Sequence, residues 1–307
     1  MSKAPTTSSS KALTELLDPE FLTRLDSLDV FSRKILQGKL QGERRSKRRG
    51  QSVEFADHRP YVVGDDLRFV DWNVYGRLEQ LFLKLFVEEQ DLTVHIALDA
   101  SSSIAVGGEG EAGKDRYIRT LAAALGYVGL VNNNRVTVST FADGLIGQVA
   151  NLRGRHCVHQ LAEFLLAGSA EGPSFFDKAC RQMVAGRMGS GLMIVLSDFL
   201  FKEGFTDGLR RLISRKYDLY VVQVLGPQEL EPEFSGDLRL VDVEDDDMAE
   251  VTLSAALLSY YKKNLTAYCN ELKGFCTSRG ATYTLANSAD PVEALVLNYL
   301  RRIGMLR

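Results

Sequence analysis

Three oxygen-bearing side chains alternate along the chain directly after a strongly apolar segment. Asp99, Ser101 and Ser103 follow the apolar run 93–98. Residues that alternate along an extended loop can direct their side chains toward one point. A carboxylate and two hydroxyls suit Mg²⁺, which takes six oxygen ligands, keeps several waters and commonly uses only one or two carboxylates. The pattern therefore favours a site for a hard divalent cation, Mg²⁺ or Mn²⁺.

Two further residues could complete such a site. Asp198 comes directly after the apolar run 192–196 and Ser197, in a position equivalent to that of Asp99. Ser174 follows Gly172-Pro173 at the expected start of a helix, where its hydroxyl could cap the helix or supply another oxygen. Asp and Ser after a strand also make caps and turns very often, so this structural interpretation stays open.

The elements that must position these residues follow an alternating pattern after residue 91. Apolar runs predict strands, and longer amphipathic segments between them predict helices. Near-continuous apolar strands that alternate with helices indicate an α/β fold with a mostly parallel sheet covered on both faces, in which ligands bind beyond the carboxyl ends of the strands. A hairpin with an acidic turn is expected over 238–253. The expected strands cover 93–98, 135–141, 192–196, 219–225 and 282–285, and the expected helices cover 116–130, 156–166, 176–187, 208–215, 254–278 and 292–300.

The first 90 residues have a different organisation. Residues 1–12 are polar and of low complexity, and we expect a disordered tail. We expect residues 13–39 to form a helical segment, in which Asp18-Pro19-Glu20 offers a helix start. Residues 40–90 combine expected short strands with turns, which predicts a small β-rich region ahead of the domain 91–307. Trp72, the only Trp, is expected to anchor the core of this small region.

Composition and charge exclude several classes of protein. The 307 residues are 45% hydrophobic and 25% charged with a net charge of −3, which excludes disordered and disulfide-scaffold classes and gives no general attraction to nucleic acid. The charge is uneven: the basic run 39–49 and the acidic run 244–250 are candidate protein-contact surfaces. The four cysteines lack metal or redox spacing, and no apolar run reaches the length of a membrane span. No apolar run follows the first charges, so we expect no signal peptide. We therefore expect a cytoplasmic protein.

A further series of residues carries a family resemblance. Its most specific part is Gly64-Asp65-Asp66-Leu67-Arg68-Phe69-Val70-Asp71-Trp72, followed by the Asp-x-Ser-x-Ser strand end. From about Gly42 to the C-terminus the chain resembles the domain of unknown function family 58, which pairs a small β-rich region with a von Willebrand factor A-like domain. The metal-ion-dependent adhesion site of such domains corresponds here to Asp99, Ser101, Ser103, Ser174 and Asp198, with Ser174 in place of a Thr.

The resemblance also implies a function and a partner. Members are associated with MoxR-type AAA+ ATPases in chaperone-like or complex-assembly roles, which implies a non-enzymatic, metal-dependent protein-interaction module. A bound Mg²⁺ with an incomplete shell could accept a carboxylate from that partner or its client. Two alternatives remain: a metal-dependent phosphoester hydrolase that also uses Asp65, Asp66 or Asp71, and a scaffold with an empty metal site.

Overall fold

The computed structural model describes residues 9–30, 54–87, 92–105, 113–186, 191–215, 217–232, 236–241, 248–302 and 304–306. The basic run 39–49 and residues 244–247 of the acidic run lie outside these ranges. The chain forms two compact units: residues 41–91, and residues 1–40 together with 92–307.

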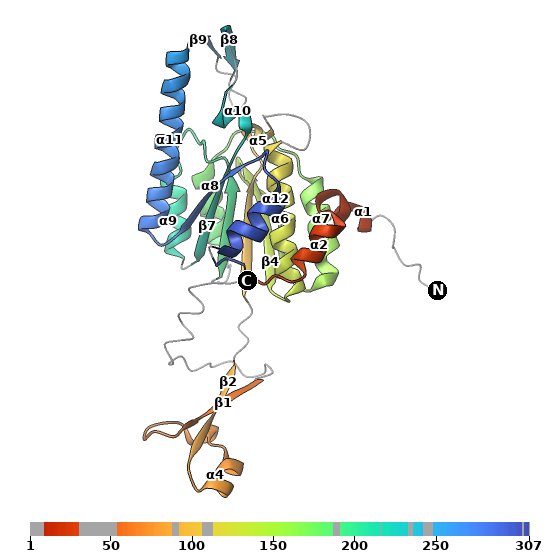
Figure 1. Ribbon diagram of the computed structural model, residues 1–307, viewed down its shortest axis with the longest axis vertical. Helices are drawn as coiled ribbons and strands as arrows, with labels where there is room; N and C mark the ends of the chain where they lie inside the picture. Colours follow the sequence, from red (N-terminus) through yellow and green to blue (C-terminus); the bar gives the residue numbers. More distant parts are fainter. Residues whose placement is uncertain are drawn as a thin grey trace, which may run out of the picture. The chain divides into compact units, whose positions relative to one another are not determined.

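The larger unit is built on a six-stranded sheet with the strand order β10-β7-β6-β3-β4-β5 (Figure 1). Five strands are parallel, namely β3 (Thr93–Asp99), β4 (Arg135–Ala142), β6 (Leu192–Ser197), β7 (Asp218–Leu225) and β10 (Thr282–Asn287). They lie where the apolar runs predicted strands, so the predicted α/β fold with a mostly parallel sheet is confirmed.

One edge strand was not predicted. Strand β5 (Gly144–Leu152) pairs antiparallel with β4 and closes one side of the sheet. Its side chains alternate between covered and exposed positions, and Gly144 and Asn151 both adopt positive φ. An edge strand of this kind lacks the continuous apolar run that marks the buried parallel strands.

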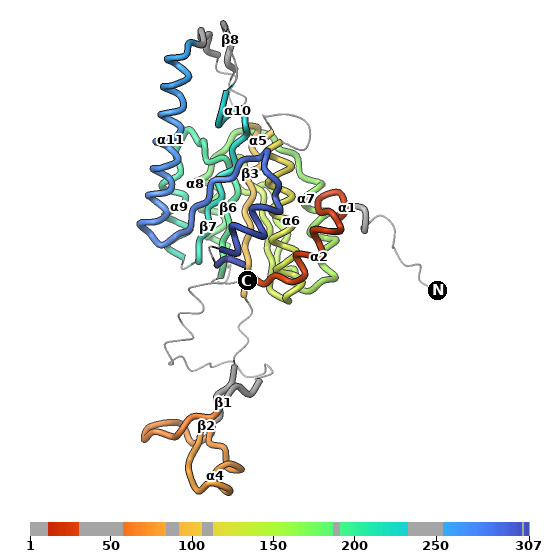
Figure 2. The backbone as a smooth tube through the Cα atoms, in the orientation of Figure 1, coloured from red at the N-terminus to blue at the C-terminus, as the bar shows by residue number. Residues whose placement is uncertain are grey.

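Helices cover both faces of the sheet. Successive strand residues point to opposite faces, and both faces carry apolar side chains that must be buried. On one face, Ile96 and Ile194 pack in a core with α6 (Lys114–Val131) and α7 (Val158–Ala167). On the other face, Ala97 and Val195 pack in a second core with residues of helices α8, α9 and α11. Figure 2 shows the position of these three helices beside the sheet. These three helices span Phe176–Ala185, Thr206–Ser214 and Ala255–Ser278.

Shorter elements complete this unit. The hairpin predicted over 238–253 is formed by β8 (Gly236–Val241) and β9 (Met248–Leu253), which pair antiparallel. The others are α5 (Ser102–Ala105), η2 (Arg155–Cys157), α10 (Pro227–Leu230), α12 (Val292–Ala294) and the π-helix η3 (Leu295–Leu300). No helix within the described ranges is long and apolar enough to cross a membrane.

The N-terminal segment corrects two expectations. Helix α1 (Ser9–Leu16) begins inside the stretch expected to be a disordered tail, and it is followed by α2 (Pro19–Leu25). The helical segment expected from residue 13 onward is interrupted before Pro19, because proline cannot continue a helix. Leu16 and Leu25 are buried in the core beside α6 and α7, and this apolar packing explains why the segment is ordered.

The smaller unit is a hairpin with two short helices. Strand β1 (Glu54–Pro60) pairs antiparallel with β2 (Phe82–Val87), and the connection holds η1 (Leu67–Phe69) and α4 (Trp72–Leu78). Asp71 caps α4 by accepting hydrogen bonds from the backbone amides of residues 73 and 74. Its other oxygen lies 2.9 Å from His58 Nε2 on β1, so this carboxylate connects the helix to the hairpin.

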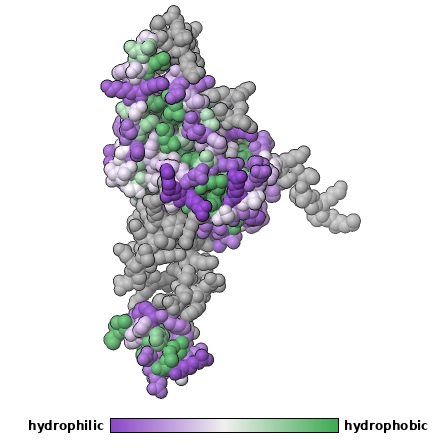
Figure 3. All heavy atoms as spheres, in the orientation of Figure 1, coloured by the Kyte–Doolittle hydropathy of each residue, from purple (hydrophilic) through white to green (hydrophobic). Residues whose placement is uncertain are grey.

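Trp72 does not anchor a core, and the expectation drawn from its size is wrong. Its side chain is 61% exposed at the first position of α4 and contacts Tyr75 edge-on, with ring centroids 6.0 Å apart. Figure 3 shows apolar side chains on the surface of this unit. One hairpin and a helix of two turns bury Val70 and Leu83 but provide too little surface to enclose an indole ring.

Candidate functional site

The two predicted carboxylates lie at the ends of neighbouring parallel strands: Asp99 is the last residue of β3, and Asp198 comes directly after β6. Leu98 on β3 pairs in register with Leu196 on β6, so the residues after them reach the same edge of the sheet. Asp99 is 2% exposed and Asp198 is 1% exposed. Ser197 Oγ donates a hydrogen bond of 2.7 Å to Asp99 Oδ2, which links the two strand ends directly.

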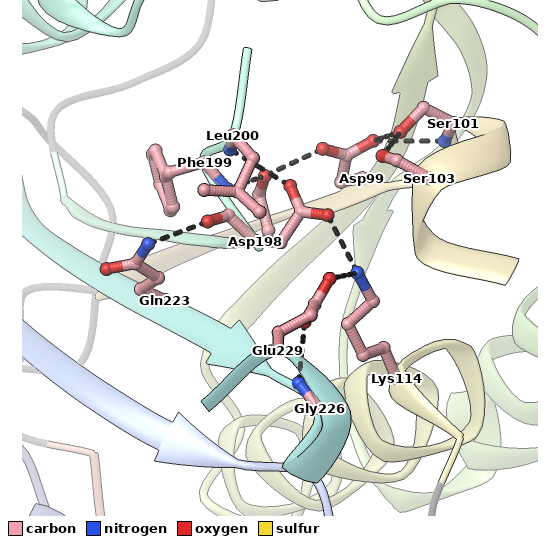
Figure 4. A network of polar contacts seen from close by, with 11 residues as sticks. Asp99, Ser101, Ser103, Lys114, Asp198, Phe199, Leu200, Gln223, Gly226 and Glu229 are labelled. Carbon is pink, nitrogen blue, oxygen red and sulfur yellow. Dashed lines mark hydrogen bonds and ion pairs between the residues drawn. The ribbon is translucent and has the colours of Figure 1, made fainter. Parts of the chain in front are cut away.

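The alternating hydroxyls gather around Asp99, as Figure 4 shows. The backbone amide of Ser101 donates to Asp99 Oδ1 at 3.0 Å, and the Ser101 hydroxyl donates to the same oxygen at 2.7 Å. Ser103 Oγ lies 3.0 Å from Ser101 Oγ. The structure therefore brings the oxygens of all three residues together at the end of the central strand.

Ser174 lies in a loop that is hydrogen-bonded to the residues directly after β3. Ser102 exchanges two hydrogen bonds with Gly172: its amide donates to the Gly172 carbonyl at 2.9 Å, and its hydroxyl accepts from the Gly172 amide at 2.8 Å. Ser174 is buried. The sequence suggested Ser174 as the N-cap of the following helix, but the N-cap of α8 is Phe175. The loop is thus held beside the cluster of Asp99, Ser101 and Ser103.

Asp198 has a cationic partner that the sequence did not indicate. Lys114, the first residue of α6, donates to Asp198 Oδ2 at 3.0 Å and to Glu229 Oε1 at 2.6 Å (Figure 4). Both Lys114 and Asp198 have side chains that are only 2% exposed. No motif marks these contacts, because they join residues 84 and 115 positions apart.

The chain after Asp198 is fixed by several hydrogen bonds. Phe199 adopts a left-handed conformation with φ +57°, which costs about 1 kcal/mol or more for a residue of this kind. Its carbonyl accepts a hydrogen bond from the Tyr268 hydroxyl on α11, and Gln223 Nε2 donates to the Asp198 carbonyl at 2.8 Å. Tyr283 in turn donates to Gln223 Oε1 at 2.7 Å. These contacts hold the Asp198 strand end in one geometry.

The electrostatics of the two carboxylates differ. Burial, together with the nearby charge of Asp198, raises the pKa of Asp99 to about 7, although hydrogen bonds from Ser197 and Ser101 oppose the shift. Burial lowers the pKa of Lys114, but the attraction of its two acidic partners outweighs it and the net shift is upward. Lys114 therefore remains an ammonium between Asp198 and Glu229.

The donor set fits a hard divalent cation. It consists of carboxylate and hydroxyl oxygens, which Mg²⁺ and Mn²⁺ prefer over softer ligands. The partners of Asp99 within the described chain are hydroxyl and amide groups, so its buried charge has no formal counter-charge there. The same part of the chain holds no group of three or more His, Cys, Asp or Glu residues arranged to bind a metal, so a cation here would depend on the serine hydroxyls.

The acidic residues of the 64–72 motif have local roles in the smaller unit. Asp65 receives both Arg59 guanidinium hydrogen bonds at 2.7 Å. Asp66 caps η1 and pairs with Arg68, and Asp71 caps α4. Each of these carboxylates therefore stabilises the turn or helix start beside it.

Known proteins resemble this chain over most of its length. An uncharacterized protein of Mycobacterium bovis is 24% identical over 257 residues, which cover 82% of this chain and 80% of that protein. Among solved structures, the conserved hypothetical protein BatB of Bacteroides thetaiotaomicron is 14% identical, with a TM-score of 0.42 over 69% of this chain and 98% of BatB. The SpRpn10 VWA domain is 8% identical, with a TM-score of 0.38 over 68% of this chain and 95% of that domain.

The family resemblance inferred from the motifs is confirmed independently. The model of the family described as "Protein of unknown function DUF58" matches residues 57–268, which include most of the hairpin unit and most of the α/β unit. This protein therefore belongs to the DUF58 family.

Proposed function

We propose that this protein is a non-enzymatic, divalent-cation-dependent protein-interaction module. One observation carries the proposal: the oxygens of Asp99, Ser101 and Ser103 meet at a sheet edge beside the buried carboxylate of Asp198. Two buried carboxylates on adjacent strands repel each other, and a divalent cation relieves that repulsion. These residues, with Ser174 on the adjoining loop, would hold Mg²⁺ or Mn²⁺.

The chemistry of the donor set supports binding rather than catalysis. Two-metal phosphoester hydrolysis requires several carboxylates around ions about 4 Å apart. This site offers two carboxylates, and one of them already pairs with Lys114. A cation held largely by hydroxyls keeps exchangeable positions, which an Asp or Glu side chain of another protein can fill.

The partner class follows from the family resemblance. We propose a MoxR-type AAA+ ATPase, or its client, as the protein that supplies the acidic ligand, with this protein as an accessory factor in complex assembly. A carboxylate is a suitable ligand because it completes the coordination of a hard cation and neutralises its charge.

Calorimetric titration tests the metal site directly. We expect Mg²⁺ and Mn²⁺ to bind the wild-type protein with a stoichiometry of one, and Asp99→Asn to weaken binding at least about tenfold because the principal carboxylate is lost. Asp177→Asn is the matched control, since Asp177 lies on α8 and pairs with Arg211. Absence of binding to the wild type, or equal binding to Asp99→Asn, would refute the proposed site.

Binding to a purified MoxR-type ATPase tests the interaction. We expect capture of the ATPase in Mg²⁺, and loss of capture both in chelator and with Asp99→Asn. Capture that is unaffected by chelator would favour the scaffold with an empty site. Hydrolysis of a model phosphoester in Mn²⁺, lost in Asp99→Asn and Asp198→Asn, would instead establish the hydrolase alternative.

A further inference from the structure

A buried lysine lies against the candidate metal site. The Lys114 ammonium has one ion pair with Asp198, at 3.0 Å, and another with Glu229, at 2.6 Å. Lysine is rarely buried unless it is paired, and its transfer from water is costly. Because a buried ion pair contributes little net stability, the position of the Lys114 ammonium beside a candidate metal ligand suggests a role in the site itself.

We propose that Lys114 is an internal counter-cation of the site, which opposes the binding of a divalent cation at Asp198 and is retained by Glu229 when the cation binds. This inference rests on the proposed metal site and concerns its regulation. In the state that the structure describes, Lys114 neutralises the carboxylate that the metal would use.

The opposition follows from the charges. A divalent cation bound through Asp198 would bring two positive charges close to the ammonium on the same carboxylate. Repulsion between such groups is weakly screened at this depth, because Lys114 and Asp198 are each only 2% exposed at the side chain. Cation binding therefore has to displace the ammonium from Asp198 or proceed against its charge.

Glu229 provides the alternative partner. Its Oε1 contacts Lys114, while its Oε2 accepts a hydrogen bond of 2.7 Å from the Gly226 amide at the start of α10. The Tyr261 hydroxyl on α11 donates to the Glu229 carbonyl at 2.9 Å. Because Glu229 is fixed by these contacts, Lys114 keeps a full ion pair after it leaves Asp198, and its flexible stem permits the small movement.

Two substitutions should change metal affinity in opposite directions. Lys114→Met removes the competing charge and keeps most of the side-chain volume, so we expect Mn²⁺ to bind about tenfold more tightly or better. Glu229→Gln removes the alternative partner and leaves Lys114 dependent on Asp198, so we expect binding to weaken several-fold. Lys178→Met is the control, because Lys178 pairs with Asp143 in an exposed ion pair and should leave the affinity unchanged.

Calorimetry with Mn²⁺ alone, at fixed pH and ionic strength, measures these effects in the full chain. Circular dichroism must first establish that each variant is folded. If Lys114→Met does not fold in chelator, Glu229→Gln carries the test, and unchanged or tighter binding to that variant overturns the inference.

The outcomes separate this inference from the proposed function. If the wild type binds Mn²⁺ and Lys114→Met binds with equal or lower affinity, the inference is overturned while the metal site stands. If only Lys114→Met binds, Lys114 is the counter-cation, but the wild-type protein is not metal-dependent. If neither protein binds Mn²⁺, both proposals fail.

Discussion

Strands β3 and β6 both end at a buried carboxylate, but different groups stabilise the negative charge at each end. Each strand carries a buried carboxylate at its C-terminal end, Asp99 on β3 and Asp198 after β6. Asp99 is surrounded by hydroxyl and amide donors, whereas Asp198 receives a full ammonium from Lys114. Hydrogen bonds from neutral donors stabilise a carboxylate, but an ion pair also cancels its charge.

The difference explains why one carboxylate is the stronger candidate for a metal ligand. The raised pKa of Asp99 reflects a charge that burial and Asp198 both disfavour. A divalent cation would supply the missing counter-charge at Asp99 and would find Asp198 already paired with Lys114. The comparison therefore predicts that changes at the two strand ends have different effects on stability and different dependence on pH and metal.

The largest effect is expected from removal of the ammonium. In chelator, Lys114→Met should lower the free energy of unfolding by about 3–5 kcal/mol, because it leaves Asp198 buried without its counter-charge. Urea denaturation monitored by circular dichroism measures this loss. Lys178→Met should cost less than about 1 kcal/mol, since that ion pair is exposed.

A double variant checks the cause of that loss. Lys114→Met combined with Asp198→Asn removes both charges, so it should recover part of the stability that Lys114→Met loses. If the double variant is no more stable than Lys114→Met, the loss comes from packing rather than from the unpaired carboxylate.

The next effect concerns Asp99 and depends on pH. The folded protein keeps the Asp99 proton up to a pKa of about 7, whereas the unfolded chain loses it near the ordinary value of 3.8. The contribution of Asp99 to stability is therefore complete below about pH 4 and is lost as the pH rises to 7. In chelator, the stability of Asp99→Asn relative to the wild type should therefore rise by on the order of 4 kcal/mol between pH 4 and pH 8.

Metal provides the control for the Asp99 prediction. Saturating Mg²⁺ at pH 8 should raise the melting temperature of the wild type and leave that of Asp99→Asn nearly unchanged. A stability difference between the two proteins that is flat from pH 4 to pH 8 would show that the Asp99 proton is not held in the folded state.

A smaller effect is expected from the hydroxyl that joins the two strand ends. Ser197 Oγ donates to Asp99 Oδ2 at 2.7 Å and accepts from the Phe199 amide at 2.8 Å. Ser197→Ala should cost about 1–2 kcal/mol, because it removes both hydrogen bonds in a buried region. Thermal denaturation measures the loss, and Ser214→Ala on the exposed end of α9 should have little effect.

Much of the fold and part of the site could be predicted from local sequence. The five parallel strands were predicted from near-continuous apolar runs, and in such a sheet the carboxyl ends of the strands lie at a common edge. This regularity placed Asp99 and Asp198 together. The Asp-x-Ser-x-Ser spacing also placed Ser101 against Asp99 and Ser103 against Ser101, but Ser103 lies in helix α5 and not in the extended loop that the sequence predicted. These predictions depend on periodicities of one element at a time, which sequence reveals directly.

The remaining features depend on contacts between distant segments. Lys114 and Glu229 meet Asp198 only after three elements pack together, and no spacing along the chain records this. Strand β5 is defined by its partner β4 rather than by its own apolar pattern. The exposure of Trp72 depends on how much surface its small unit can provide, which the size of one residue does not reveal.

An ion pair outside the site supplies the smallest effect and the opposite pH dependence. Asp177, in the first turn of α8, contacts Arg211 at 2.6 Å and Arg181 at 2.5 Å, and these partners lower its pKa in the folded protein. The stability that Asp177 contributes is therefore present above pH 3.8 and is lost as the pH falls through the lower folded pKa. Asp177→Asn should cost less than about 1 kcal/mol at pH 7, because the side chains of Arg211 and Arg181 are 42% and 63% exposed to solvent, and the cost should shrink toward pH 3. Urea denaturation across this range measures it. If Asp177→Asn instead became more stable than the wild type as the pH rose from 4 to 8, as expected for Asp99→Asn, burial at the strand end would not distinguish Asp99 from Asp177.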